Sequence, residues 1–352
     1  MSSTRYNFKK IINRLILFIG LGVFAHIIFV LSTTEKSLIL YLNKLSPGHI
    51  LLIILLMLYP WVSYAARVVM WSRFLKEKLS YADALRVVIT ADLASALSPT
   101  AVGGAPVKAA LLINRGFSPG SVGFMLTYGV IEDIIFYITG IVLAGFFSAG
   151  LLSQIGQELS DFFNAYAWQI IVIVAVLSTY FLMLYHKKIP SRYRIWVYLP
   201  EKMRTRIFQF RTKMSQSFKE MSSNFTHALK NGKLKMVLSM LMLYIQWLSK
   251  FSVLIVILHA FNIDFNTIQI YVRQWVIYVT MLFIPTPGAS GGAEASFLLI
   301  FGKSIPSDIT YLVVSLWRLF TYYFLLVAAV IFYSLLSYFL RKEEDLVIET
   351  QD

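Results

Sequence analysis

The chain has 352 residues, of which 58% are hydrophobic and only 14% charged, a composition that excludes a soluble domain and indicates an integral membrane protein. Cysteine is absent, which excludes disulfides, thiolate-bound zinc and thiol catalysis. Residues 187–235 hold thirteen Lys or Arg against two acids and so account for +11 of the formal net charge of +14. Because basic loops stay in the cytoplasm, we expect 187–235 to be a basic cytoplasmic loop.

Six apolar stretches are long enough to cross a bilayer, which takes about 20 helical residues. In chain order they are residues 10–32, 48–71, 119–147, 167–185, 236–260 and 309–340. The first resembles a signal peptide, but it is too long and lacks a small-residue cleavage site, so we expect a retained signal anchor. The charge bias then predicts a multi-pass protein of the plasma (inner) membrane with both termini in the cytoplasm.

One helix-breaking motif occurs twice, 188 residues apart. Residues 98–105 read Ser-Pro-Thr-Ala-Val-Gly-Gly-Ala, residues 286–293 read Thr-Pro-Gly-Ala-Ser-Gly-Gly-Ala, and five of the eight positions are identical. Proline lacks a backbone donor and glycine tolerates positive φ, so each copy breaks a helix. At membrane depth, broken helices line protein cavities.

The arms that flank each motif are too short or too charged to span a membrane. They cover 79–97 and 105–115 around the first copy, and 267–284 and 293–303 around the second. An arm of about 11 residues crosses only about half of the hydrocarbon core. Each motif is therefore predicted to be the tip of a re-entrant helical hairpin.

The same offset of 188 residues relates the spans on either side of the two hairpins. Span, hairpin and span thus occur twice, in a first repeat at 48–147 and a second at 236–335. The charge bias has the hairpins enter from opposite sides, as in the inverted repeats of secondary transporters. We expect residues 1–352 to form one all-α transmembrane domain, with six spanning helices and two re-entrant hairpins.

Each Gly-Gly pair precedes a short predicted helix, where free backbone donors and the helix dipole attract phosphate or carboxylate. Hydroxyls in the motifs add further donors, and close helix packing is the alternative role of the glycines. The residues predicted to surround a phosphate-bearing headgroup are Ser98, Pro99, Thr100, Gly103, Gly104, Lys108, Thr286, Pro287, Gly288, Ser290, Gly291 and Gly292.

Ionisable residues inside apolar segments should face a cavity or a partner. They are Asp92, Glu132, Asp133, Lys250, Glu294 and Arg318. The offset carries Glu132 and Asp133 to within one turn of Arg318, so we expect a salt bridge or substrate clamp between these acids and Arg318; an ion pair that only locks the bundle is the alternative. We expect Arg318 to balance the phosphate, and the three glutamate and aspartate side chains at 132, 133 and 294 to contact a cationic group or take up a proton. The first-turn position of Glu294 also stabilises its helix dipole, and Lys250 either snorkels or pairs with an acid.

The chain carries no motif for a catalytic nucleophile, metal or nucleotide, so neither enzymatic activity nor a cofactor is expected. Aromatic residues interleave the basic stretch at 187–235, which favours either nucleic acid or an anionic membrane as its partner. Beside two predicted spans, anionic lipid headgroups are the nearer partner, and we expect no nucleic acid.

Residues 98–108 and 111–116, and later 285–295 followed by Trp317 and Arg318, carry a family resemblance. Over about 15–340 the chain resembles the lysylphosphatidylglycerol synthase transmembrane-region family, the flippase-like domain of the multiple peptide resistance factor. The resemblance implies a membrane protein that moves a lipid headgroup between leaflets, with aminoacylated phosphatidylglycerol, hopanoids and polyprenyl-linked sugars as candidate lipids. It does not imply the synthase, whose separate soluble domain we do not expect here. DedA-type proteins, which also pair re-entrant hairpins, are a weaker family alternative.

Two other functions remain open from the sequence. The chain is either a lipid carrier or a non-transporting scaffold that holds a lipid for a partner synthase or glycosyltransferase, with 187–235 as the docking surface. A small-solute carrier built on the same inverted plan is the third possibility.

Overall fold

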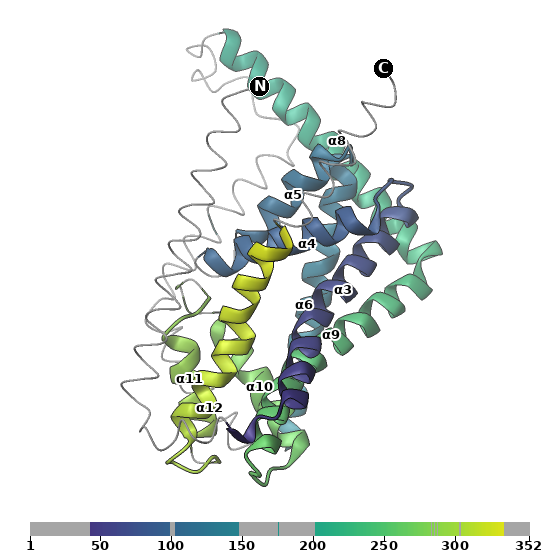
Figure 1. Ribbon diagram of the computed structural model, residues 1–352. Coiled ribbons are helices and arrows are strands. Elements are labelled where there is room, and N and C mark those ends of the chain that lie inside the picture. Colours follow the sequence, from purple (N-terminus) through teal and green to yellow (C-terminus); the bar gives the residue numbers. More distant parts are fainter. Residues whose placement is uncertain are drawn as a thin grey trace, which may run out of the picture.

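The structure is a computed structural model that describes residues 43–98, 103–147, 201–282, 284, 286, 288–302 and 304–333, with residue 175 alone between the second and third ranges. All regular secondary structure within these ranges is helical. Figure 1 shows most of the longer helices running along a common bundle, while the helix over residues 201–231 lies obliquely and extends beyond its upper end. The all-α prediction is therefore confirmed for the described residues.

The first half contains two long helices separated by two short ones. They are α3 (Pro47–Phe74), α4 (Tyr81–Leu97), α5 (Gly104–Asn114) and α6 (Pro119–Phe147). Local chemistry sets their starts: the Ser46 hydroxyl accepts from the His49 amide and Ser80 accepts from the Asp83 amide, so each serine satisfies a free N–H of the first turn.

The second half repeats this order. Its helices are α9 (Lys233–Ala260), α10 (Thr267–Met281), α11 (Gly292–Phe301) and α12 (Thr310–Arg318). The last helix continues through a π-helical segment, η3 (Leu319–Phe324), and stays helical to Tyr333. Asn266 caps α10 by accepting from the Gln269 amide at 3.2 Å.

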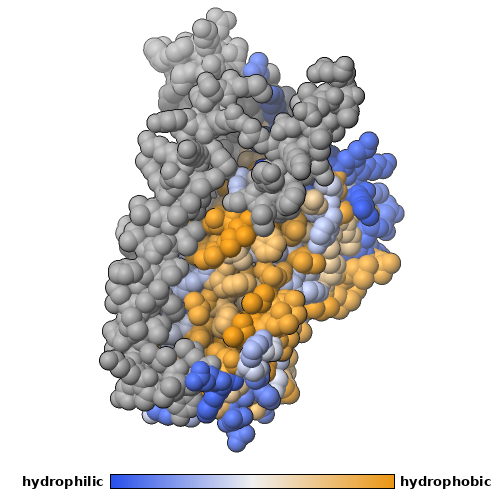
Figure 2. Space-filling view, viewed as in Figure 1, coloured by the Kyte–Doolittle hydropathy of each residue, from blue (hydrophilic) through white to orange (hydrophobic). Residues whose placement is uncertain are grey.

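Four described helices are long and apolar enough to cross a membrane: Pro47–Phe74, Pro119–Phe147, Lys233–Ala260 and Thr310–Tyr333. They coincide with four of the six predicted spans. The other two predicted spans, 10–32 and 167–185, lie outside the described residues apart from residue 175. Figure 2 shows hydrophobic side chains in a band across the middle of the visible face, with hydrophilic ones toward both ends, as expected of a membrane-embedded bundle.

The short helices occupy the positions predicted for the hairpin arms. Helices α4 and α5 pack together, as do α10 and α11. The long helices α3 and α9 pack along each other. In Figure 1 the pair α4–α5 lies toward one end of the bundle and α10–α11 toward the other. The offset of 188 residues carries the start of α5 at Gly104 onto the start of α11 at Gly292. This arrangement is the one that an inverted repeat requires; the repeat itself stays a prediction.

The predicted basic connection at 187–235 is helical over most of its length. Residues 201–231 form one helix, α8 (Glu201–Asn231), which packs against α6. The reason is a helical spacing of contact residues: Met221 and Phe225 lie against the core, and Ala228 is buried. Gly232 then separates α8 from α9. The surface of this part of the chain is therefore a helix face, and its cytoplasmic location stays a prediction.

Two glycines allow helices to approach closely. A Cβ on Gly104 would lie 1.9 Å from the Ser95 hydroxyl, so α5 can pack on α4 only with glycine at this position. A Cβ on Gly140 would lie 2.3 Å from the Trp275 ring, which fixes the contact between α6 and α10. Both contacts tie a hairpin arm to a neighbouring helix, and so they position the ends of the hairpins.

Candidate functional site

A cavity of about 230 Å³ lies where the end of α4 meets the tip of the second hairpin. The first hairpin contributes Asp92 and Ala96 near the end of α4, and the second contributes Thr286 and Gly288. Arg318 and the π-helical segment η3 form another wall. The Tyr322 hydroxyl, on η3, donates to the Ala96 carbonyl at 3.1 Å and so joins this wall to α4. Both predicted hairpins therefore contribute to one cavity.

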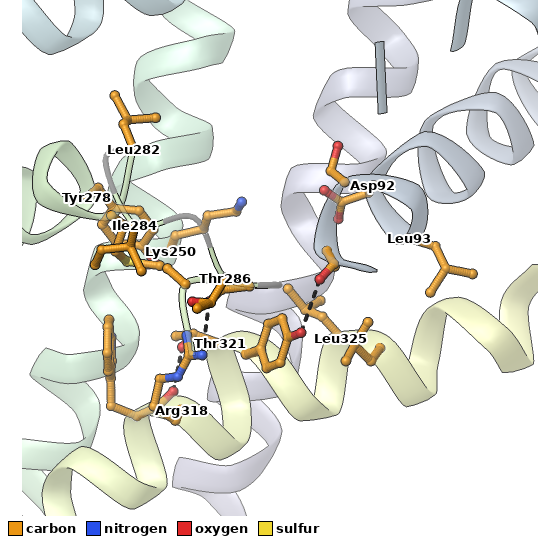
Figure 3. A pocket seen from close by; sticks show the side chains of 18 of the residues that line it. Asp92, Leu93, Lys250, Tyr278, Leu282, Ile284, Thr286, Arg318, Thr321 and Leu325 are labelled. Carbon is orange, nitrogen blue, oxygen red and sulfur yellow. Dashed lines mark hydrogen bonds between the residues drawn. The ribbon is translucent and has the colours of Figure 1, made fainter. Parts of the chain in front are cut away.

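Two charged side chains enter the cavity from facing helices. Figure 3 shows Lys250 of α9 and Asp92 of α4 projecting toward the same space. Asp92 accepts a hydrogen bond from the Trp61 indole at 2.8 Å, which holds its carboxylate in place. The Lys250 ammonium lies 5.1 Å from the centroid of the Trp247 ring, and no ion pair involves Lys250 within the described part of the chain. The cavity thus contains a positioned cation that makes no ion pair with the carboxylates of the described residues.

Arg318 also lines the cavity, but its charge is already balanced. Its Nε donates to Glu294 Oε1 at 2.7 Å and its Nη2 to the Gly288 carbonyl at 3.0 Å. The second carboxylate oxygen of Glu294 accepts from the Gly291 amide at 2.7 Å. Arg318 is only 2% exposed. The Glu294–Arg318 pair therefore fixes the tip of the second hairpin to the last span.

The remaining walls are largely apolar and aromatic. Tyr137, Tyr278 and Trp317 line the cavity, together with aliphatic side chains that include Leu325 and Leu326. A few fixed polar groups within an apolar pocket are the usual composition of a site for an amphiphilic ligand.

Comparison with known proteins agrees with this architecture. A family model described as the lysylphosphatidylglycerol synthase TM region matches residues 17–329, nearly the whole chain. The chain belongs to this family. A UPF0104 membrane protein of Archaeoglobus fulgidus is 24% identical over 271 residues, which cover 75% of this chain and 79% of the relative. The membrane-protein assignment of this lysylphosphatidylglycerol synthase TM region protein follows from the match and from its apolar helices.

The predicted ion pair between Arg318 and the acids of α6 is wrong. In this member of the family, Glu132 binds Arg67 of α3 and Arg318 binds Glu294. Arg67 and Glu132 are 4% and 2% exposed, and Arg67 Nε donates to the Ser239 hydroxyl of α9 at 3.2 Å. Glu132 and Glu294 each pair with an arginine of the same half of the chain, and neither charge is left alone at membrane depth.

The glycine amides predicted to bind phosphate are partly occupied. The Gly103 amide donates to the Ser98 hydroxyl at 2.8 Å, and the Gly291 amide donates to Glu294. The prediction that these two amides are free is wrong, because Ser98 of the first motif and Glu294, directly after the second, accept from them. Gly104 and Gly292 begin α5 and α11, and the space beside both is filled by side chains, Ser95 and Ile284 respectively. The packing role of the glycines is the one that the geometry supports.

The other predicted site residues fall into three groups: those that line the cavity, those that do not, and those outside the described residues. Thr286, Gly288 and Arg318 line the cavity. Lys108 does not line it; this lysine is 5% exposed and donates to the Tyr64 hydroxyl at 2.7 Å. Ser98, Ser290, Glu132 and Asp133 are also absent from the cavity wall. Pro99, Thr100 and Pro287 lie outside the described residues.

Sequence reasoning did not assign Asp92, Lys250 or the lining tyrosines to the site. The two charges are visible in the sequence as ionisable residues in apolar segments, but no spacing rule brings residues 158 positions apart to one cavity. Arg67 gave the same signal, a lone cation within the apolar stretch 48–71. For these residues, a charge within an apolar segment indicates a functional or paired position. The structure is needed to identify the group that each charge faces.

Proposed function

We propose that this protein is a carrier, rather than an enzyme, that moves a phosphate-bearing lipid between the two leaflets of the plasma membrane. The observation that carries the proposal is the cavity between the end of α4 and the tip of the second hairpin, which contains the unneutralised cation Lys250. Aminoacylated phosphatidylglycerol, hopanoid and polyprenyl-phosphate-linked lipids remain the candidate classes. Family membership supports a lipid-related membrane function of this kind.

Lys250 is the residue suited to the phosphate. Arg318 is held by Glu294 and by the Gly288 carbonyl, so an entering phosphate would have to displace these bonds to gain its charge. Lys250 needs no such exchange, because its ammonium faces the Trp247 ring instead of a carboxylate. A phosphate beside Lys250 gains a charge-assisted hydrogen bond in a site of low dielectric.

The carboxylate of Asp92 favours a headgroup that carries hydrogen-bond donors in addition to its phosphate. Asp92 Oδ2 accepts a hydrogen bond from the Trp61 indole N–H. The carboxylate lies at the opposite side of the cavity from Lys250. Hydroxyl or ammonium groups of a headgroup are suitable partners for this carboxylate. The apolar wall formed by Leu325 and Leu326 suits the acyl or prenyl portion next to the headgroup.

The experiment is lipid scrambling in proteoliposomes with fluorescent phosphatidylglycerol, lysyl-phosphatidylglycerol and polyprenyl-phosphate analogues. Lys250→Ala removes the proposed phosphate ligand, and Lys250→Arg keeps its charge. Lys233→Ala, at the exposed start of the same helix, is the matched control. We expect Lys250→Ala to slow scrambling by about tenfold to a hundredfold, as the loss of one charge-assisted hydrogen bond predicts. Lys250→Arg should retain most of the rate, and Lys233→Ala all of it.

Two results would contradict the proposal. Undiminished scrambling by Lys250→Ala would remove Lys250 from the site. If the wild type scrambles none of the analogues, the scaffold function gains support, in which the chain holds a lipid for a partner synthase or glycosyltransferase. In that case α8 is the first surface to test for docking, because it carries much of the basic charge of 187–235.

A further inference from the structure

A second cavity, of about 210 Å³, lies where α9 connects to α10, and α10 is at the end of the bundle opposite α4 and α5 (Figure 1). Its polar lining comes from the connection, the first two turns of α10 and the segment after α11, and consists of Asp264, Asn266, Gln269, Arg273 and Ser304. The cavity that contains Lys250 and Asp92, here called the headgroup cavity, shares no lining residue with it. The two cavities are therefore separate sites.

Arg273 supplies the second cavity with a cation that makes no ion pair within the described part of the chain. Its Nη1 donates to Ser304 Oγ and, at 3.4 Å, to the Ile300 carbonyl, and its guanidinium carbon lies 5.9 Å from the centroid of the Phe301 ring. These contacts position the side chain. Its buried Nε has no hydrogen-bond partner among the described residues. Because an unpaired buried donor is costly, Arg273 gains from an acceptor that a ligand brings.

The absence of a carboxylate partner distinguishes Arg273 from two other arginines of the structure. Arg67 and Arg318 are each bound to a glutamate. Arg273 lines the same cavity as Asp264, yet neither residue takes part in an ion pair with the described residues. The cavity thus offers a cation and a carboxylate that do not satisfy each other, and a ligand with both an anionic group and donor groups can bind both.

The second cavity resembles the headgroup cavity in size and composition. The volumes are about 210 and 230 Å³, and each cavity contains one cation and one carboxylate that form no ion pair among the described residues. Both also have apolar walls, which in the second cavity are formed by Leu258, Ile263, Phe265, Ile270 and Ile305. A headgroup that fits one cavity therefore finds similar chemical groups and a similar space in the other.

The same two helices, α9 and α10, line both cavities. On α9, Lys250 lines the headgroup cavity, and Leu258, eight residues later, lines the second one. On α10, Arg273 of the second cavity precedes Tyr278 of the headgroup cavity by five residues. At 1.5 Å per residue these separations are about 12 Å and about 8 Å along the helix axes. The second cavity is thus displaced along the bundle toward the end at which α9 ends and α10 begins.

We propose that the second cavity is a further binding site for the phosphate-bearing lipid headgroup, with Arg273 as its phosphate ligand. The planar guanidinium binds phosphate oxygens through charge-assisted hydrogen bonds. Asp264 accepts from hydroxyl or ammonium groups of the headgroup, and the apolar wall contacts the adjoining hydrocarbon. The lipid then has two binding positions, one beside Lys250 and one beside Arg273 nearer the end of the bundle. This choice of ligand rests on the proposed function, whereas the site itself does not require Lys250.

The test counts the binding sites for short-chain phosphatidylglycerol on the purified full chain in a non-ionic detergent, by calorimetric titration. We expect two sites in the wild type. Arg273→Gln should weaken one of them by about tenfold to a hundredfold, as the loss of a charge-assisted hydrogen bond predicts, and Lys250→Ala should weaken the other. Lys233→Gln removes a charge about 38 Å along α9 from Leu258; it is the matched control and should keep both sites.

A second variant covers the case in which Arg273→Gln does not fold. Gln269→Glu adds a carboxylate to the same cavity and leaves Arg273 unchanged. An acid in the first turn of α10 is favoured by the helix dipole, so we expect this variant to fold. It should weaken the same site as Arg273→Gln does. Arg273→Lys keeps the charge and should bind more tightly than Arg273→Gln.

Inorganic phosphate separates a lipid site from a site for free anions. It carries the same oxygens as the headgroup but gains nothing from the apolar wall. At millimolar concentration it should therefore leave the lipid bound at the Arg273 site. Displacement of the lipid by inorganic phosphate alone would overturn the assignment of a lipid ligand.

The failure of this inference and that of the proposed function give different results. A single site that Lys250→Ala weakens, and that Arg273→Gln and Gln269→Glu do not, overturns the second site and leaves the proposed function standing. A single site with the opposite response supports the second site and removes Lys250 from lipid binding. A lower unfolding midpoint in Arg273→Gln with both sites retained assigns Arg273 a structural role only. Absence of lipid binding by the wild type overturns both proposals.

Discussion

Replacement of Glu294 tests whether the second hairpin tip is held by the Glu294–Arg318 ion pair. Arg318 is 2% exposed, and Glu294 is the carboxylate that faces it, so Glu294→Gln leaves a buried guanidinium without a counter-charge. Breaking a buried ion pair on one side costs about 3–5 kcal/mol. The glutamine carbonyl can still accept from the Gly291 amide, which separates loss of charge from loss of the helix cap. A loss of this size is a large share of the roughly 5–15 kcal/mol that stabilises a typical folded protein.

The assay is thermal unfolding of the purified protein in detergent, together with the yield of folded protein from membranes. We expect a fall of several degrees in the unfolding midpoint for Glu294→Gln. The double variant Glu294→Met with Arg318→Met removes both charges and should recover most of the loss, because the penalty comes from the partner left unpaired. The four-state cycle then gives the coupling energy between the two residues.

One outcome would refute this reasoning. If Glu294→Gln unfolds at the wild-type temperature and yet loses lipid scrambling, Glu294 acts on the substrate and the ion pair is not what holds the tip. The single variant Arg318→Met should be as destabilising as Glu294→Gln, since it leaves the carboxylate unpaired in turn. Equal stability of all four proteins would exclude a structural role for the pair.

Three further predictions concern helix packing, helix capping and the hydrogen bond that positions Asp92. Gly140→Ala should destabilise the protein by about 1–3 kcal/mol, seen as a lower unfolding midpoint, because its Cβ would meet the Trp275 ring at 2.3 Å; a neutral result would show that this ring moves aside freely. Glu220→Ala removes the acceptor for the serine that precedes α6 and should expose α8 to limited proteolysis, with a cost of about 1 kcal/mol, whereas unchanged cleavage would place the docking of α8 elsewhere. Trp61→Phe frees the carboxylate of Asp92 from its indole donor at a cost of about 1–3 kcal/mol and should weaken lipid binding; wild-type affinity would mean that this carboxylate needs no positioning.

Hydropathy and helix-breaking residues predicted the fold well where the signal is local. The spans at 48–71, 119–147 and 236–260 coincide with α3, α6 and α9, because about 20 apolar residues have few alternatives to a membrane-crossing helix. The arms around residues 98–105 and 286–293 were found for a similar reason, since proline and glycine break a helix wherever they occur. The charge count at 187–235 did not indicate the helix α8, because net charge carries no information on periodicity and α8 follows from its spaced contact residues.

The site was harder to predict, because its residues depend on contacts between distant segments. The motif residues were identified, but their donors proved to be used inside the hairpins: the Gly103 amide binds Ser98 and the Gly291 amide binds Glu294. A sequence shows that a glycine can present its amide, yet not which oxygen accepts it. Lys250 and Asp92 were visible as intramembrane charges, and only the fold places α4, α9 and the second hairpin around one cavity.

The internal hydrogen bonds of the Gly103 and Gly291 amides have a consequence for the range of molecules that such a scaffold can serve. The Gly103 and Gly291 amides are bonded within their own hairpins, so these two donors are satisfied without a bound molecule. Recognition then falls to side chains on the walls, such as Lys250, Asp92 and Tyr137. Substitutions at these positions can adapt the cavity to a new headgroup without refolding the hairpins. The same architecture can thus be engineered for different cargoes by redesigning a few wall positions.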